Sequence, residues 1–499
     1  MSTAHQISDQ IIYGKLASVS RFAGERLRRV SRSALIAESG AYAAGLVTGD
    51  GSLVHQVQSE IEHLYALRSV SRHLLDYFAY DLEEGDVLIS ADVYKGGTKG
   101  QTLTMLLPVF ADGELIVSPV IRAQMADLGG EIPGGYNPEA FEVWQESMRL
   151  TPVKLYKGGK LQRDVRRFVL ANGRSPELLE SDLLAMQACL EEARRSIQAV
   201  VGSYGLPAVH QAIERMNERT RLRTAELLPA VTRPLSGAAK LAIAQADVGI
   251  QLQMERRDQR WKFDFTGTSQ QVSLPYNISR ETASACAVTA LLAGSMEDLE
   301  INDGLLDVFE FILPEGSLVH AAFPAATAFG FLTSGQAVAA AVTQAMRAEA
   351  DPAFPAVHGP SPLTVLYPPV GSQTPMEPVF LEPGFAIAEN GWSASVLQGA
   401  RRLVSAEELE WRSGLRIGYR KRLEDGDMEV RLDVLRGKYE ASIFVPEGGT
   451  DVRIVAGDGV HSGTAKGIPV AAGAALEYRY ASAEPLKRLV KEDNDGPSR

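Results

Sequence analysis

The stretch ISADVYKGGTKGQTLTMLLPVFADGELIVSPVIRAQMADLGG (residues 89–130) decides the fold. With the residues just before it, it contains apolar runs at 86–94, 103–110 and 114–130, and short apolar runs bounded by turn residues are typical of buried strands. ADGE (111–114) predicts a tight hairpin turn. The loop ADVYKGGTKGQT (91–102) combines an acid, an aromatic ring, a glycine pair and a lysine, and this composition indicates that it holds a small charged ligand.

Helix and strand patterns alternate on both sides of this stretch. TGDG (48–51) predicts a turn between two strands, and residues 61–79 have apolar side chains at helical spacing. Residues 176–228 predict a helical hairpin, because the first helix reaches a stop at Gly205 and the second starts at Pro207. We therefore predict a multidomain, mixed α/β fold with mixed sheets, a helical hairpin arm and a β-rich C-terminal region.

Four regions follow from these patterns. They are an N-terminal α/β domain with the 91–102 loop (1–175), the helical hairpin arm (176–232), a central α/β domain with FDFTGTS (233–370) and a β-rich C-terminal domain (371–499).

Composition narrows the class of protein. The 499 residues carry 50 basic and 62 acidic side chains, a net charge of −12 without a clustered basic face, which argues against a nucleic-acid partner. The longest apolar stretch, 282–296, is shorter than the roughly 20 residues that span a bilayer. Cys189 and Cys286 are far apart in apolar, helical surroundings, and no secretory signal opens the chain. We expect a cytoplasmic protein that binds neither nucleic acid nor membrane.

The chain shows no nucleotide-binding motif. A P-loop needs a lysine directly after its last glycine, whereas Lys99 lies between Gly97 and Gly100. No G-x-G-x-x-G follows a strand and no G-x-S-x-G occurs. We therefore predict no nucleotide site on this chain.

Isolated acids and a histidine are the candidates for a metal or substrate site. His63 lies on a predicted helix, and Asp92 and Asp127 each follow a predicted strand, where ligands are often presented. Taken alone, each of these residues fits a cap or turn better than a ligand. FDFTGTSQQ (263–271) places polar side chains around Gly267, and by itself this stretch fits a tight turn with local hydrogen bonds better than a binding site.

A series of motifs in order resembles the hydantoinase B/5-oxoprolinase family. The resemblance rests on ADVYKGGTKGQT, PVFADGEL and RAQMADLGGEIPGG, and on the later FDFTGTSQQ, LPYN, NDG, LPEGSLVHAAFPAA and TSGQAVAAAVTQAM. It covers residues 20–350. It implies a B-type subunit of an ATP-dependent machine, in which a separate A-type subunit with an actin-like fold handles ATP and phosphorylates the substrate. In several members a divalent metal lies in the B-type subunit.

The chain departs from the family pattern at the expected chemistry. Imidazole and carboxylate positions of the family are replaced here by Lys99, Thr102, Gln124 and Met125, while Asp92 and Asp127 are retained. Losing imidazoles removes the nitrogen ligands that Zn²⁺ or Mn²⁺ prefers. We expect Lys99 to lie near Asp92 and to replace the charge of the metal with an ion pair.

The resemblance gives a set of expected site residues. Asp92, Lys99 and Asp127 would be catalytic; substrate would contact Tyr94, Gly96, Gly97, Thr98, Thr266 and Thr268; residual metal positions would be Glu38, His63 and Asp92. ATP and Mg²⁺ would be bound by the A-type partner, and a second B-type or small subunit could complete a hetero-oligomer. We expect hydrolysis of a cyclic amide. The alternatives are a subunit of an acetone- or acetophenone-type carboxylase, and a non-catalytic structural subunit.

Overall fold

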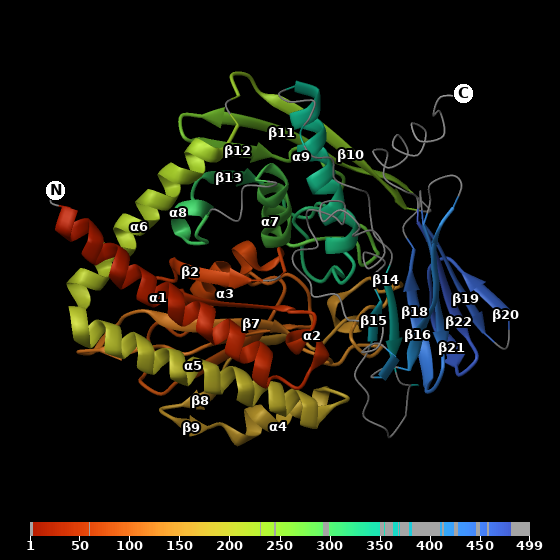
Figure 1. Cartoon of the computed structure of the whole chain (residues 1–499), viewed down its shortest axis with the longest axis horizontal. Helices are drawn as coiled ribbons and strands as arrows, with labels where there is room; N and C mark the ends of the chain where they lie inside the picture. Colours follow the sequence, from red (N-terminus) through yellow and green to blue (C-terminus); the bar gives the residue numbers. More distant parts are fainter. Residues whose placement is uncertain are drawn as a thin grey trace, which may run out of the picture.

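The computed structural model describes residues 3–58, 60–229, 231–243, 246–292, 299–349, 354, 363–367, 369, 379–381, 410–411, 414–423, 428–445, 450–456 and 459–480 (Figure 1). Helices and several sheets form a multidomain α/β structure, as predicted.

A seven-stranded sheet forms the centre of the N-terminal region. Its strand order is β2–β1–β7–β4–β3–β8–β9, and all of its pairs are antiparallel. The strands are β1 (Tyr42–Val47), β2 (Leu53–Gln58), β3 (Val87–Ala91), β4 (Thr102–Leu106), β7 (Ser118–Gln124), β8 (Leu150–Lys157) and β9 (Lys160–Leu161). The predicted ADGE hairpin is confirmed between β5 (Phe110–Ala111) and β6 (Glu114–Leu115).

Helices cover both faces of this sheet. In β1, Ala44 and Leu46 belong to the core under α1 (Thr3–Val30) and α5 (Pro176–Tyr204), whereas Ala43 and Val47 belong to the core under α3 (His63–Tyr77). Successive side chains of a strand point to opposite faces. Two covered faces therefore favour apolar residues on both sides of a strand, which is why these strands appear as largely apolar runs in the sequence.

The helical hairpin of α5 and α6 (Leu206–Leu227) is confirmed, with Gly205 at φ 78° between the two helices. A positive φ is adopted most readily by glycine, and this explains the break at this residue. The hairpin packs along α1 (Figure 1). Asp9 pairs with Arg215 across that contact, and Asp182 Oδ1 accepts a hydrogen bond of 3.0 Å from the Arg32 amide.

A second, mixed sheet lies in the central region, with the order β10–β11–β12–β13. It contains β10 (Leu235–Ile243), β11 (Ala246–Arg257), β12 (Arg260–Asp264) and β13 (Phe309–Ile312), and only the β12–β13 pair is parallel. Helix α7 (Arg280–Leu291) is buried from its second residue to its end. It contacts α3 and α9 (Gln336–Glu349), so the central core is continuous with one face of the N-terminal sheet.

Two antiparallel sheets make the C-terminal region (Figure 1). One has the order β15–β14–β18–β21 and the other β16–β17–β22–β19–β20. Their strands are β14 (Leu363–Tyr367), β15 (Val379–Leu381), β16 (Leu415–Arg422), β17 (Met428–Val434), β18 (Lys438–Phe444), β19 (Thr450–Ala456), β20 (Gly459–Ser462), β21 (Ala465–Ala471) and β22 (Ala475–Tyr480). The four domain boundaries stay predictions. Strand β14, from the span assigned to the central region, pairs with β18 of the C-terminal region.

Among the helices of the described ranges, none combines the length and the apolar character needed to cross a bilayer.

Candidate functional site

The loop 91–102 leaves the end of β3 and returns at the start of β4. Asp92 is buried in it: its Oδ1 accepts the Tyr94 amide at 3.0 Å, and its Oδ2 accepts Arg149 Nε at 3.0 Å and lies 2.9 Å from Nη2. We expected Asp92 to pair with Lys99, and the ion pair that the structure gives for Asp92 is with Arg149. Arg149 can reach Asp92 because it immediately precedes β8, and β8 pairs with β3, the strand that leads into Asp92.

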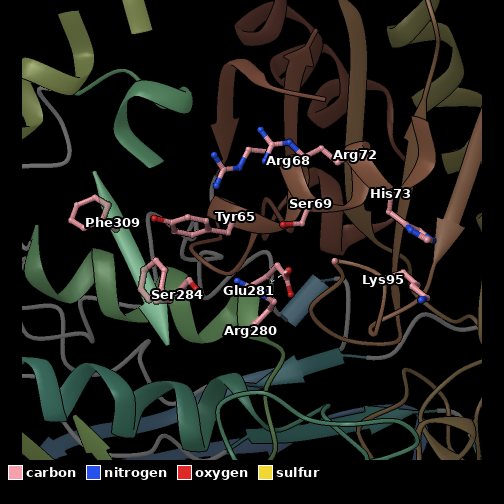
Figure 2. Close-up of a pocket in the computed structure, with 12 residues that line it drawn as sticks. Tyr65, Arg68, Ser69, Arg72, His73, Lys95, Arg280, Glu281, Ser284 and Phe309 are labelled. Carbon is pink, nitrogen blue, oxygen red and sulfur yellow. Dashed lines mark ion pairs between the residues drawn. The ribbon is translucent and has the colours of Figure 1, made fainter. Parts of the chain in front are cut away.

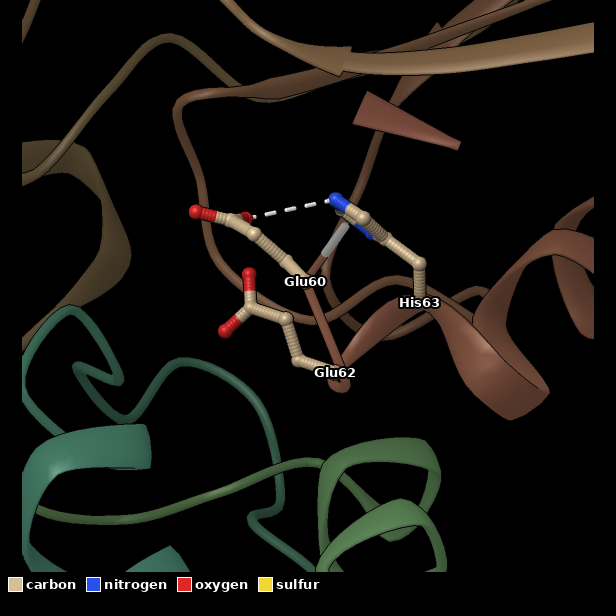
Figure 3. A group of neighbouring side chains, drawn as sticks. All are labelled: Glu60, Glu62 and His63. Carbon is tan, nitrogen blue, oxygen red and sulfur yellow. Dashed lines mark ion pairs between the residues drawn. The ribbon is translucent and has the colours of Figure 1, made fainter. Parts of the chain in front are cut away.

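Lys99 instead enters a buried cluster at the start of α3. Its Nζ lies 2.8 Å from Glu62 Oε1 and 3.7 Å from Glu60 Oε2. His63 Nε2 lies 3.4 Å from the same Glu60 oxygen, and Figure 3 shows the Glu62 carboxylate pointing into the space beside that pair. Burial lowers the pKa of His63, against the opposing effect of Glu60. We call Glu60, Glu62, His63, Lys99 and Arg122 the Lys99 cluster.

Arg122 is the second cation of the Lys99 cluster. It is fully buried on β7 and donates from Nη1 to Thr104 Oγ1 and from Nη2 to Thr98 Oγ1, both at 2.9 Å. Thr98 Oγ1 in turn lies 3.5 Å from Glu62 Oε1. Burial lowers the pKa of Arg122 to about 10, and nearby carboxylates, Glu62 first, oppose that shift. The guanidinium stays charged at neutral pH, so two cations face two carboxylates.

The residues present do not fit a divalent metal. One ligand atom each from Glu60, Glu62 and His63 lies within 4.8 Å of the others, which suits a cation, but the Lys99 ammonium already contacts both carboxylates. A divalent ion placed there would meet that ammonium and the Arg122 guanidinium at close range.

The positions at which the chain departs from the family pattern come together in space. Thr102 lies opposite Gln124 across β4 and β7, and the Thr102 amide donates to the Lys99 carbonyl at 3.3 Å. None of these three side chains is an imidazole or a carboxylate. The imidazole and carboxylate ligands that a transition metal needs are therefore absent from these positions.

A cavity of about 500 Å³ opens beside the Lys99 cluster, between α3, the loop, the start of α7 and β13 (Figure 2). Most of its polar lining is basic: Arg68, Arg72, His73, Lys95 and Arg280. Gly96 also lines it, at φ 85°, and a Cβ at this position would lie 2.7 Å from the Ser69 carbonyl carbon. Only glycine allows the loop to pack this closely on α3.

Glu281 connects the cavity with the Lys99 cluster. It lines the cavity together with Ser69 of α3. Burial raises the pKa of Glu281, and although both Ser69 and Arg122 act to lower the pKa of its carboxyl, the net shift is upward, so its protonated form is favoured more than in water. A buried carboxyl with a raised pKa at a cavity wall is a common form of catalytic acid or base.

The remaining predicted site residues lie outside this cavity. Asp127 accepts the amides of Gly129 (2.9 Å) and Gly134 (3.1 Å) and pairs with Arg174 Nη1 at 3.1 Å, so it organises the glycine-rich loop. The Tyr94 hydroxyl donates to the Ala325 carbonyl, and Gly97 packs against the Asp92 carbonyl.

Thr266 and Thr268 belong to the turn after β12. The Thr266 amide donates to Asp264 Oδ1 at 2.9 Å, and Thr268 exchanges hydrogen bonds with the Gln251 backbone. Glu38 caps the C-terminus of α2 (Ala34–Ala37) and is buried. The structure thus brings Lys99 and His63 into the Lys99 cluster, Thr98 into contact with Arg122 at its edge, and Gly96 to the cavity. The other predicted residues lie in neither.

Three members of the Lys99 cluster, Glu60, Glu62 and Arg122, were not predicted, and neither was any of the cavity lining except Gly96, including Glu281. Glu60 and Glu62 stand just before His63 in SEIEH, and Arg122 interrupts an apolar strand. A charge inside an otherwise buried run signals a buried partner. That signal was present at Arg122, but its partners come from other elements.

Comparison with known proteins gives a consistent result. The model of the family described as "Hydantoinase B/oxoprolinase" matches residues 5–426. "Caprolactamase subunit beta" of Pseudomonas jessenii is 29% identical over 218 residues, which are 44% of this chain and 38% of that protein. The chain spans between 30% and 63% of the length of the first three curated relatives that it matches.

Two solved structures share the fold. The ATP-dependent caprolactamase of Pseudomonas jessenii superposes with a TM-score of 0.84 at 22% identity, covering 96% of this chain and 91% of that one. A nucleotide-free acetone carboxylase superposes with a TM-score of 0.78 at 14% identity, covering 95% of this chain and 75% of that one.

Proposed function

The chain belongs to the hydantoinase B/oxoprolinase family, and from this premise we propose that it is the B-type subunit of an ATP-dependent heteromeric enzyme. An A-type ATPase subunit, with its ATP and Mg²⁺, would phosphorylate a cyclic amide, and this chain would complete the opening of the ring. A relative named as a beta subunit and a structure named as an ATP-dependent caprolactamase support this proposal. The free, buried Cys189 and Cys286 suit a reducing cytoplasm, where we place the complex.

The observation that carries the proposal is the cavity beside the Lys99 cluster. It has the volume of a small-molecule site, and it lies against the loop that carries the family motif. We propose that Lys99 and Thr98 set the electrostatic field at the inner end of the cavity. Glu281, a buried carboxyl that lines the cavity and lies in the field of Arg122, would transfer a proton.

The two retained acids would act through the backbone that they hold. Asp92, fixed by Arg149, would keep the 91–102 loop in place and hold Gly96 at the cavity wall. A substrate contact with Tyr94 or Gly97, which lie outside the cavity, stays a prediction. Asp127, fixed by Arg174, would do the same for the glycine-rich loop. A contact of substrate with Thr266 or Thr268 would require it to reach the turn after β12, and this stays a prediction.

Two other functions have an observation in their favour. The superposition on acetone carboxylase over 95% of this chain favours a carboxylase subunit. The balanced charges of the Lys99 cluster, two carboxylates against two cations, favour a structural subunit without its own chemistry.

Reconstitution with the A-type partner tests the proposal. We expect ATP-dependent ring opening of caprolactam, hydantoin or 5-oxoproline only with both subunits.

A matched pair of variants tests the role of Lys99. Lys99→Arg keeps the charge and changes its geometry, so it should lower the rate at least about tenfold while the subunit stays folded; Lys160→Arg on β9 is the matched control. Unchanged turnover in Lys99→Arg and Glu281→Gln would favour the structural subunit. Bicarbonate-dependent loss of acetone without ring opening would favour the carboxylase.

A further inference from the structure

The cavity has two chemically different ends. Figure 2 shows Tyr65 and Phe309 at one end and His73 and Lys95 at the other. The aromatic end is well packed: the Tyr65 and Phe311 rings meet edge to face with centroids 5.6 Å apart, and the Tyr65 hydroxyl is bonded to the Leu306 carbonyl at 3.3 Å. Rings therefore form this wall, and a flat apolar group would fit against it.

Two of the arginines that line the cavity, Arg68 and Arg72, form ion pairs with acids outside it. Arg68 Nη1 lies 2.9 Å from both Asp303 and Asp307, and Arg72 Nη2 lies 3.2 Å from Asp303. Asp303 opens the short helix α8 (Asp303–Leu306). These pairs fix the two guanidinium groups and neutralise them, so they shape the wall without a net charge.

Lys95 and Arg280 differ from those arginines. Within the part of the chain that the structure describes, no ion pair is recorded for Lys95, and the closest carboxylate oxygen to Arg280 is that of Glu281 at 4.0 Å. Both side chains are exposed. Glu281 also lines the cavity, so Lys95 and Arg280 together leave it with an excess of positive charge. Lys95 lies at the end opposite the aromatic wall (Figure 2).

We propose that the cavity binds a small organic anion: a planar or apolar ring against Tyr65 and Phe311, with a phosphate or carboxylate at Lys95. Ser69 and Ser284 add hydroxyl groups between the two ends. The volume of about 500 Å³ suits one ring with one or two substituents. This binding site stands without the proposed function, since it requires neither a partner nor turnover.

Calorimetric titration of the whole chain, without ATP and without partner, tests the site. Phenyl phosphate, benzoate, inorganic phosphate and benzyl alcohol separate the two ends. We expect one of the two aromatic anions to bind at least about tenfold more tightly than either benzyl alcohol or inorganic phosphate, because only the aromatic anion uses both ends. If phenyl phosphate binds more tightly than benzoate, phosphate is the preferred anionic group; the reverse order identifies carboxylate.

Matched variants locate the binding. Lys95→Ala should lower the affinity for the tighter-binding aromatic anion roughly tenfold or more. Arg280→Gln removes the second exposed cation and tests whether Arg280 substitutes for Lys95 in the first variant. Lys160→Ala, the same change on β9 away from the cavity, should leave the affinity unchanged. No binding by either aromatic anion, equal binding of benzyl alcohol, or full affinity in both cavity variants would overturn the proposal. Loss of turnover with binding retained would bear on the proposed function alone.

Discussion

Lys95 and Lys99 come from the same loop, four residues apart, and have opposite environments. Lys99 is 7% exposed and contacts two buried carboxylates, whereas Lys95 is exposed at the rim of the cavity. A charge buried among partners stabilises one arrangement of the chain, and a charge at a cavity rim is available to a ligand. We therefore expect Lys99 to contribute mainly to stability and Lys95 mainly to ligand binding, and the following experiments test this difference.

The largest effect is expected from Lys99→Ala. It leaves Glu60 and Glu62 buried with one cation fewer, so we expect the free energy of unfolding to fall by about 3–5 kcal/mol. Urea titration measures it. A loss below about 1 kcal/mol would mean that the Lys99 cluster is open to water.

The same variant should gain a metal site. With the ammonium gone, Glu60, Glu62 and His63 can offer three ligands within 4.8 Å. Zn²⁺ at about a hundred times its dissociation constant would stabilise Lys99→Ala by about 2.7 kcal/mol, seen as a raised Tm, and leave the parent chain unchanged. Adding His63→Ala should abolish the gain. A raised Tm in the parent chain would contradict the view that Lys99 fills the site.

His63 gives the Lys99 cluster a pH dependence. Burial lowers its pKa, so the folded chain binds fewer protons than the unfolded chain, and stability falls as pH drops below the unfolded value of about 6.5. Between pH 7 and 5 we expect His63→Gln to lose roughly 1 kcal/mol less than the parent chain. Unfolding titrations at the two pH values measure this difference, with His210→Gln on α6 as the control. Equal slopes in all three proteins would contradict it.

The smallest effect is expected from Lys95→Ala. An exposed side chain without a recorded ion pair should change the free energy of unfolding by less than about 0.5 kcal/mol. The same urea titration measures it beside Lys99→Ala. A change above 1 kcal/mol would give Lys95 a structural role and remove the contrast between the two lysines.

Local patterns predicted most of the framework. The helical hairpin followed from Gly205 and Pro207, and the β5–β6 turn from ADGE, because both signals act within a few residues. The motif order identified the family correctly.

The site was harder to predict because its contacts are long-range. We predicted an ion pair of Lys99 with Asp92 because both belong to the 91–102 loop. In the structure Arg149, just before β8, pairs with Asp92, and Lys99 pairs with Glu62 at the start of α3. The cavity needs α3, α7 and β13 together, and no single stretch of sequence contains that information.

Gly96 lies between the two lysines and packs closely against Ser69, so this position of the loop cannot accept a larger residue without moving. Any side chain at this position would lift the loop from α3 and move the rim lysine and the buried lysine together. The ligand preference of the cavity and the integrity of the ion cluster are therefore mechanically linked at one residue. A substitution of Lys95, or of a residue in the aromatic wall, can therefore change the ligand preference without disturbing the Lys99 cluster. A substitution of Gly96 would change both.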